Sequence, residues 1–213
     1  MAVTDQNVLN EIQQLLIETP NNGASWSSGQ WTAQEVINYL NQRQWDFLKQ
    51  TALLMARATL PTNPNVTRQP LPTDWITTQR VVWQDQNGTM TEVPRGDGWE
   101  ADHAVTTWPY NLYSGPPLLY TDGEVPNLQL EIMPAPQGSG VLQILYVNLS
   151  AALSNSGVAF TVPDEWTPCI KWGVIADMLG KVGRGMAPEQ ATYAETRYQE
   201  GVEAAKVALH GWM

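Results

Sequence analysis

Cysteine is almost absent from this sequence: Cys169 is the one cysteine among 213 residues. A single cysteine excludes an internal disulfide and a zinc site built from cysteines. The sequence also lacks an apolar run long enough to span a membrane. Its N-terminus has no basic segment followed by an apolar stretch, so we expect no signal peptide and predict synthesis and folding in a cytosol.

Positive charge is scarce as well. The chain has 11 lysines and arginines against 21 aspartates and glutamates, a formal net charge of −10, and no lysine or arginine between Gly96 and Ile170. Binding to duplex DNA depends on lysine and arginine displacing counterions, so this composition argues against a nucleic-acid-binding protein. We expect the middle of the chain to present an acidic surface. Hydrophobic residues make up 43% of the sequence, which is ample material for a folded core.

Two helices are predicted near the N-terminus. Asp5 can cap a short first helix, and Thr32 with Glu35 has the spacing of a capping box at the start of a second one. Apolar residues near heptad spacing extend the second helix to about Thr59, and Pro61 closes it. These patterns predict a helical part over residues 1–62.

The middle of the chain has the pattern of short strands separated by turns. The segments "QRVVWQ" and "GTMTEV" flank "DQNG", in which Asn-Gly favours a hairpin turn. The segment "NLQLEIM" places Leu128, Leu130 and Ile132 on one face, whereas "VLQILYV" is apolar on both faces, as expected of a central strand. We predict an antiparallel β-module over residues 63–161.

The remaining residues, 162–213, are predicted to be helical. Asp164 or Thr167 is the expected cap, and the apolar stripe at every fourth position includes Val182, before "GKVGRGMAP" interrupts the helix. A last helix follows from Pro188, with a predicted seam of Ala191, Ala194, Tyr198, Val202, Ala205 and Leu209. The predicted fold class is α+β, in which the N- and C-terminal helices pack as a small bundle and the antiparallel β-module is inserted between them.

Cys169 has two interpretations. A helix N-terminus and the nearby Lys171 would activate its thiol, and a cysteine hydrolase would then need His103 or His210 as the base. Neither histidine lies in a recognisable catalytic motif. Free cysteine is among the most buried residue types, so we favour a small core residue at the start of a helix and predict no catalytic residue.

The other short motifs also favour structural roles. The segment "GKVGRG" lacks the preceding strand and the Lys-Ser or Lys-Thr pair of a phosphate-binding loop, which favours a helix end and a turn. The tripeptide Arg95–Asp97 is most simply a turn. Calcium loops need acidic residues at every second position, and no such run occurs. We therefore predict no cofactor-binding residues and no metal ligands.

Tryptophan is unusually frequent, with ten residues. Six of them fall in or beside predicted loops: Trp26, Trp31, Trp75, Trp83, Trp99 and Trp108. Tryptophan is favoured in cores and at protein–protein interfaces because it buries a large area with few rotamers. We favour those roles over the stacking of sugars by a carbohydrate-binding module.

Three segments together carry a resemblance to a known family. In order they are "QWTAQEVINYLNQRQWDFL", "GPPLLYTDGEVPNLQLEIMPAPQGSGVLQILYV" and "VPDEWTPCIKWGVIADMLGKVGRGMAPEQATYAETRYQEGVEAA". They resemble the head–tail adaptor (connector) proteins of tailed bacteriophages. In that family a capped helix leads into a β-module with a Pro-Xaa-Xaa-Tyr, strand, Pro-Xaa-Pro, strand pattern. A Pro-Asp-Glu-aromatic helix start and a final helix rich in alanine and tyrosine follow.

The resemblance implies a structural virion protein without enzymatic activity. It implies a ring of about a dozen copies, a dodecamer, beneath the portal protein in the virion neck. Such a ring continues the DNA channel, lets genomic DNA pass without specific binding, and docks a tail or nozzle protein; no membrane is involved. The chain would be made in the host cytoplasm.

The apolar C-terminal tail is the predicted contact with the portal, through Leu209, His210, Trp212 and Met213. The alternatives to an adaptor are another neck or tail-completion protein, and a tryptophan-rich carbohydrate-binding module.

Overall fold

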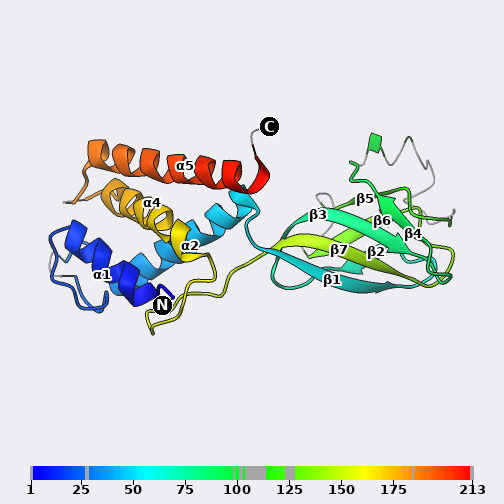
Figure 1. Ribbon diagram of the computed structural model, residues 1–213, viewed down its shortest axis with the longest axis horizontal. Helices are drawn as coiled ribbons and strands as arrows, with labels where there is room; N and C mark the ends of the chain where they lie inside the picture. The colour runs from blue at the N-terminus through cyan, green and yellow to red at the C-terminus, as the bar shows by residue number, and fades with distance from the viewer. Residues whose placement is uncertain are drawn as a thin grey trace. The chain divides into compact units, whose positions relative to one another are not determined.

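The computed structural model describes residues 2–26, 29–97, 99–100, 103, 114–122, 128–183 and 185–211, with the side chain of His210 left out. The chain divides into two compact units (Figure 1). A helical unit contains Met1–Leu54 and Leu149–Met213, and a β unit contains Met55–Asn148. The β unit is therefore an insertion between N- and C-terminal helices, which confirms the predicted α+β class.

Helix α2 (Ala33–Thr51) begins as its sequence predicts. Thr32 is the N-cap, and its side chain and that of Glu35 each bond the other's backbone N–H, as in a capping box. The indole of the preceding residue, Trp31, is buried and donates a hydrogen bond to the carbonyl of Met178, 3.0 Å away. The start of α2 is thereby held against the end of a distant helix.

The predicted end of that helix at Thr59 is wrong. Helix α2 ends at Thr51, followed by Ala52 in the left-handed conformation, and Met55–Thr62 form strand β1. Side chains in β1 alternate between more and less exposed, and the strand pairs along its whole length with strand β7 (Gly140–Asn148). Pairing with a partner 78 to 92 residues away in sequence overrides the helical pattern.

The cap of helix α1 (Asp5–Leu15) also differs from the prediction. Thr4 is the N-cap and forms a capping box with Asn7. Asp5 is instead fully buried, and its carboxylate accepts hydrogen bonds from the backbone N–H groups of Ser154, Ser156 and Gly157. These residues belong to the segment that enters the helical unit after the β unit. A predicted helix cap is therefore a tertiary contact that fastens this segment to α1.

Helix α4 (Thr167–Gly180) lies at the centre of the helical unit, between α5 (Pro188–His210) and the pair α1 and α2 (Figure 1). Neither predicted cap is used: the 3-10 turn η2 (Asp164–Trp166) precedes α4, and no side chain caps either element. Val182 lies beyond the end of α4 and is 85% exposed, so its place in the predicted stripe is wrong. The predicted seam of α5 is buried at Ala194, Tyr198, Val202 and Ala205, whereas Leu209 is exposed.

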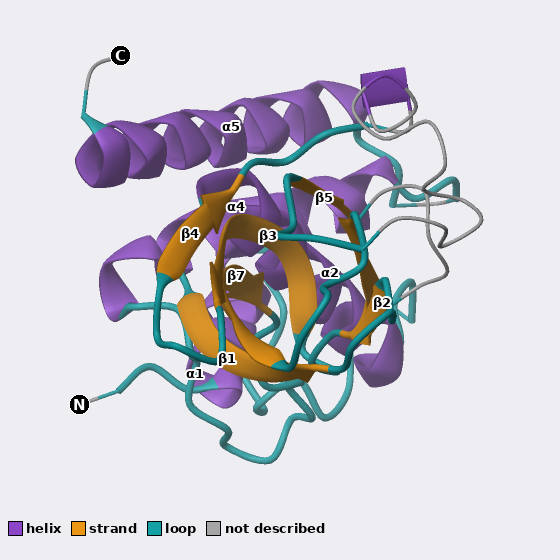
Figure 2. Ribbon diagram, turned by 90° about the vertical axis from the view of Figure 1, so that its right-hand side faces the viewer, coloured by secondary structure: helices purple, strands orange, loops and turns teal. Residues whose placement is uncertain are grey.

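The β unit consists of two antiparallel sheets. The four-stranded sheet has the order β1-β7-β3-β4, and the three-stranded sheet has the order β2-β6-β5. The strands not yet given are β2 (Arg68–Pro70), β3 (Trp75–Gln84), β4 (Met90–Val93), β5 (Leu119–Thr121) and β6 (Gln129–Met133). Viewed end-on, the strands curve around one interior (Figure 2).

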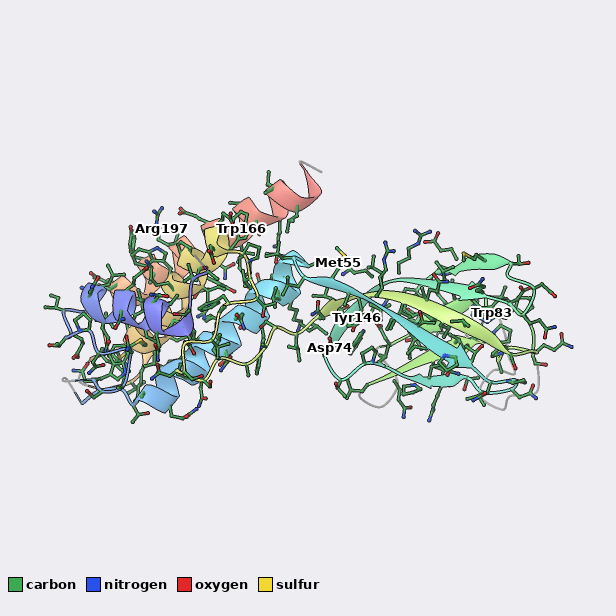
Figure 3. The ribbon with its side chains drawn as sticks, turned by 60° about the horizontal axis from the view of Figure 1, so that its bottom comes forward. Met55, Asp74, Trp83, Tyr146, Trp166 and Arg197 are labelled. Atoms are coloured by element: carbon green, nitrogen blue, oxygen red, sulfur yellow. The ribbon has the colours of Figure 1, made fainter. Side chains whose placement is uncertain are left out.

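Three sequence predictions hold in this unit. β3 and β4 form the predicted hairpin around "DQNG", and β7 is central, between β1 and β3. Leu130 and Ile132 of β6 are fully buried in the shared core with Ile144 and Val81. Leu128, predicted on the same face, is the exception: it precedes β6, has a positive φ and is 39% exposed. At the edge of this core the hydroxyl of Tyr146 donates to Asp74 over 3.0 Å (Figure 3).

Candidate interaction surfaces

A cluster of charged residues joins three helices of the helical unit. Arg43 of α2 donates two hydrogen bonds, of 2.7 and 2.6 Å, to the carboxylate of Asp177 in α4, and its Nη2 lies 2.8 Å from the carboxylate of Glu195 in α5. Its guanidinium also stacks on the ring of Tyr198, at 4.9 Å. Gly173 permits the crossing, because a Cβ there would lie 2.9 Å from the Arg43 side chain.

Electrostatics keep this cluster charged. Burial works to lower the pKa of Arg43, but hydrogen bonds and charge from Asp177 and Glu195 outweigh it, and the pKa is raised. Burial raises the pKa of Tyr198. The cluster therefore supplies an ionic bond that joins three helices.

Cys169 is placed as a packing residue. It lies in the first turn of α4, is half-buried, and faces Gly201 of α5. Burial raises the pKa of its thiol, which is the opposite of the lowered pKa that an activated nucleophile needs. The structure thus favours the core interpretation of Cys169.

Substitutions at Cys169 and Gly201 can test how closely α4 and α5 pack. A Cβ on Gly201 would overlap the sulfur and lie 2.8 Å from the Cβ of Cys169, so Gly201→Ala is expected to destabilise the helical unit by about 1 kcal/mol, after the gain in helix propensity. In a Cys169→Gly background the same change meets only the Cα, at 3.7 Å, and is expected to stabilise by about 1 kcal/mol. Urea unfolding of the four variants measures both effects. The same sign in both backgrounds would contradict the packing.

No group of three or more histidine, cysteine, aspartate or glutamate residues in the described part of the chain is placed to hold a metal ion. Across the same residues, no helix combines the length and apolar character needed to cross a bilayer.

Three of the five described tryptophans in or beside the predicted loops are buried. Trp26 and Trp31 are buried and meet edge to face at 5.9 Å, and Trp83 is buried in the β unit (Figure 3). Trp99 is 71% exposed and stacks near His103, with ring centres 4.7 Å apart. Trp108 lies outside the described residues. Most of the described loop tryptophans therefore serve the core, the role that the sequence analysis favoured.

One end of the helical unit exposes apolar side chains. The Asp164 carboxylate accepts a hydrogen bond from the backbone N–H of Val3, and Lys171 forms an ion pair with Glu11. Because these contacts follow in the same order along both chain segments, α1 and α4 run in the same direction and end together. Leu15, the last residue of α1, is 50% exposed. Beyond the two helix ends, Ile17, Val182 and Met186 are 95%, 85% and 48% exposed. Such a group on one end marks a candidate protein contact, and the sequence analysis missed it.

The predicted C-terminal contact is only partly visible. Leu209 is 43% exposed in the last turn of α5, and Gly211 follows it with a positive φ. The side chain of His210, and Trp212 and Met213 as a whole, lie outside the described residues.

Ion pairs engage most of the described basic residues. The paired residues are Arg43, Arg68, Arg80, Arg95, Lys171, Lys181, Arg197 and Lys206. In the part of the chain that the structure describes, Lys49 and Arg57 lie outside these pairs. In the middle of the chain, the predicted acidic surface loses two of its carboxylates, because Asp122 and Glu131 are buried and lie in ion pairs with Arg95 and Arg68.

A family model described as SU10 adaptor protein matches residues 6–210. No curated protein matches the chain. Among solved structures, a chain from "Neck of empty GTA particle computed with C6 symmetry" is 18% identical, with 93% of each chain covered and a TM-score of 0.28. Because that TM-score is low, the family model is the comparison that bears on function.

Proposed function

Since the chain belongs to the SU10 adaptor protein family, it has a structural role in a phage-like particle, and we propose that it is a head–tail adaptor of the virion neck. In this proposal, about a dozen copies form a closed ring beneath the portal protein. The ring extends the DNA channel and offers a docking surface to a tail or nozzle protein. The chain is made in the host cytoplasm and acts without an enzymatic activity or a cofactor.

The observation that carries the proposal is the extent of the family match. Residues 6–210 include both units, from the first turn of α1 to the end of α5. The three segments that resemble phage adaptors correspond to the capped helix α2, to the strands β5–β7, and to α4 with α5. The match thus spans both the helical unit and the inserted β unit.

The charge distribution suits a channel through which DNA passes. The basic residues are largely neutralised by ion pairs, which leaves a net charge of −10 carried by carboxylates. Phosphates are repelled by such a wall instead of being bound. DNA could therefore slide past the ring without adhering to it.

We place the portal contact at the C-terminal tail, residues Leu209–Met213. Leu209 exposes an apolar side chain at the end of α5, and the tail beyond it is rich in apolar residues. Deleting residues 209–213 is expected to lower binding to purified portal protein at least tenfold while leaving helix content unchanged. If deletion of the C-terminal tail leaves portal binding intact, the contact lies elsewhere. The next variant to test is then Ile17→Asp, in the exposed apolar group beyond the ends of α1 and α4.

The proposed function is tested by quantitative mass spectrometry of purified particles. A fixed number near a dozen copies per particle is the expected result. Hundreds of copies would indicate a capsid or tail-tube component, and absence from the particle would refute the adaptor proposal. A fixed low number without portal contact would favour another neck or tail-completion protein.

A further inference from the structure

The outer face of the four-stranded sheet has a hollow of about 290 Å³ across strands β1, β7 and β3. Successive residues of a strand point to opposite faces of the sheet. In β1, Ala56, Ala58 and Leu60 pack on the core, so the residues between them face outward. The outward residues that line the hollow are Arg57, Thr59, Arg80, Val82, Gln143 and Leu145.

The register of the strands places an arginine on each side of an apolar floor. Leu145 of β7 lies opposite Arg57 on one side and opposite Arg80 on the other, so the three form one row across the sheet. The next row consists of Thr59, Gln143 and Val82. Leu145 and Val82 are half-buried, whereas both arginines are exposed.

This hollow is a basic site on a protein that carries a net charge of −10. Arg80 already binds Glu92 through two hydrogen bonds, of 3.1 and 3.0 Å. Within the part of the chain that the structure describes, Arg57 lies outside the ion pairs. A free guanidinium beside an apolar floor fits a group that combines an aromatic ring with carboxylates, because arginine both stacks on rings and pairs with carboxylates.

The β unit itself presents a group of that chemistry. Trp99 is 71% exposed, more than any other described tryptophan. It lies between Asp97 and Glu100, which are exposed and form a reciprocal cap: the Glu100 carboxylate accepts from the Asp97 N–H at 3.2 Å, and the Asp97 carboxylate accepts from the Glu100 N–H at 2.8 Å. We call these three residues the Trp99 turn. Tryptophan is enriched at the energetic centres of protein interfaces.

The chain just before the Trp99 turn is fixed to strand β5. The N–H of Gly96 donates to the carbonyl of Tyr120 at 2.8 Å, and the N–H of Tyr120 donates to the carbonyl of Pro94 at 2.9 Å. Arg95 forms an ion pair of 2.6 Å with Asp122, whose side chain is only 1% exposed. The turn is therefore held in place, so it loses little conformational freedom when it binds.

The Trp99 turn and the hollow lie on different sides of the β unit. Viewed end-on, the short helical turn that contains Trp99 and Glu100 lies at the upper right, beyond β5, whereas β1 and β7 lie on the other side of the interior (Figure 2). Figure 1 separates them in the same way, with the turn above β5 and β1 along the lower side. A contact between the turn and the hollow must therefore join two copies.

We propose that the Trp99 turn of one copy docks in the hollow of the next copy. The indole covers Leu145 and Val82 and meets the guanidinium of Arg57 in a cation–π contact, and the two carboxylates of the turn lie against the arginines. Pockets for small molecules begin at roughly 300 Å³, so the hollow has room for one large side chain. Because the two surfaces differ, the contact is head-to-tail and can close a ring by rotation.

This inference rests on the proposed ring, since it names the surfaces that join the copies, and cross-linking tests it separately. In full-length protein with Cys169→Ala, the pair Glu100→Cys and Gln143→Cys is treated with a short thiol cross-linker, both in solution and in purified particles. The expected product is a ladder of covalent multimers. Each single cysteine variant should give no ladder. Neither should the pair Glu100→Cys and Asn87→Cys, because Asn87 is exposed at the β3–β4 turn, outside the hollow.

Substitution of the anchor and of its charged neighbours supplies the second measurement. Sedimentation should show that Trp99→Ala weakens association of the copies at least tenfold. The control Trp45→Ala, at a tryptophan of α2 that is 38% exposed, should change it less than twofold. If the free protein is a monomer, the number of copies incorporated per particle is the readout for the same variants.

Charge reversal tests the electrostatic part of the contact. Arg57→Glu should weaken association about fivefold or more, because an attraction to the turn becomes a repulsion. Combining it with Glu100→Arg should give stronger association than either single variant. Lys49→Glu makes the same charge change at an exposed residue of α2 and should have no such effect.

The outcomes separate this interface from the proposed function. A ladder from the Glu100 and Gln143 pair, together with weaker association of Trp99→Ala, supports the docking. No ladder in solution or in particles overturns it, even if mass spectrometry finds a dozen copies per particle, and the adaptor proposal then stands with another interface. A ladder of equal yield from the Asn87 pair, or unchanged association of Trp99→Ala, overturns it as well.

Discussion

Replacing Arg43 with methionine is expected to lower the free energy of unfolding of the helical unit by about 3 kcal/mol. The substitution removes the two hydrogen bonds to Asp177, the ion pair with Glu195 and the stacking on Tyr198 at once. It also leaves two neighbouring carboxylates without their cation, in a site where the Asp177 side chain is only 24% exposed. Urea unfolding followed by helical circular dichroism measures the loss.

The β unit offers a matched control with the same chemistry at the surface. Arg80 also donates two hydrogen bonds to one carboxylate, that of Glu92, but the two side chains are 57% and 61% exposed. Arg80→Met should change stability by less than about 1 kcal/mol, since water and salt screen an exposed pair. The loss of stability caused by Arg43→Lys should lie between those of the two methionine variants, because lysine keeps the positive charge but lacks the planar guanidinium that donates two hydrogen bonds to one carboxylate. Equal losses for Arg43→Met and Arg80→Met would contradict the argument that burial makes the difference.

Replacing Asp5 with alanine is expected to cost about 3 kcal/mol and to loosen the segment that follows the β unit. The buried carboxylate accepts from Ser154, Ser156 and Gly157 at 3.3, 3.2 and 2.9 Å, as well as from the adjacent backbone of Gln6. Without it, three backbone N–H groups of this segment would lose a partly buried charged acceptor that holds them to α1. Denaturant unfolding gives the stability, and amide hydrogen exchange over residues 154–157 reports the local effect.

Asp164→Ala is the control for this second prediction. Asp164 also accepts a backbone N–H, from Val3 at 3.0 Å, but that bond is exposed. Water can replace it, so we expect a change of less than about 1 kcal/mol and no faster exchange at residues 154–157. If the amides of residues 154–157 exchange as slowly in the Asp5→Ala variant as in the unmodified protein, the carboxylate of Asp5 does not hold this segment.

Features that depend on adjacent residues were predictable from the sequence. The capping box of Thr32 and Glu35, the Asn-Gly hairpin and the apolar character of β7 each arise within a few residues, and all three are present. The order of such local signals was also enough to identify the adaptor family. Features that depend on partners distant in sequence could not be predicted. Met55–Thr62 follow a helical pattern but form β1, and Asp5 looks like a cap but binds a loop some 150 residues away.

The sequence by itself determined the composition of the helical and β parts, the excess of negative charge, the start of α2 and the family. The tertiary structure alone decided where the β unit begins and which charges are buried together around Arg43. It also decided the order of the strands in the two sheets. The physical reason is the range of the interactions: caps, turns and apolar periodicity are local, whereas strand pairing and buried ion pairs join residues that only the folded chain brings together.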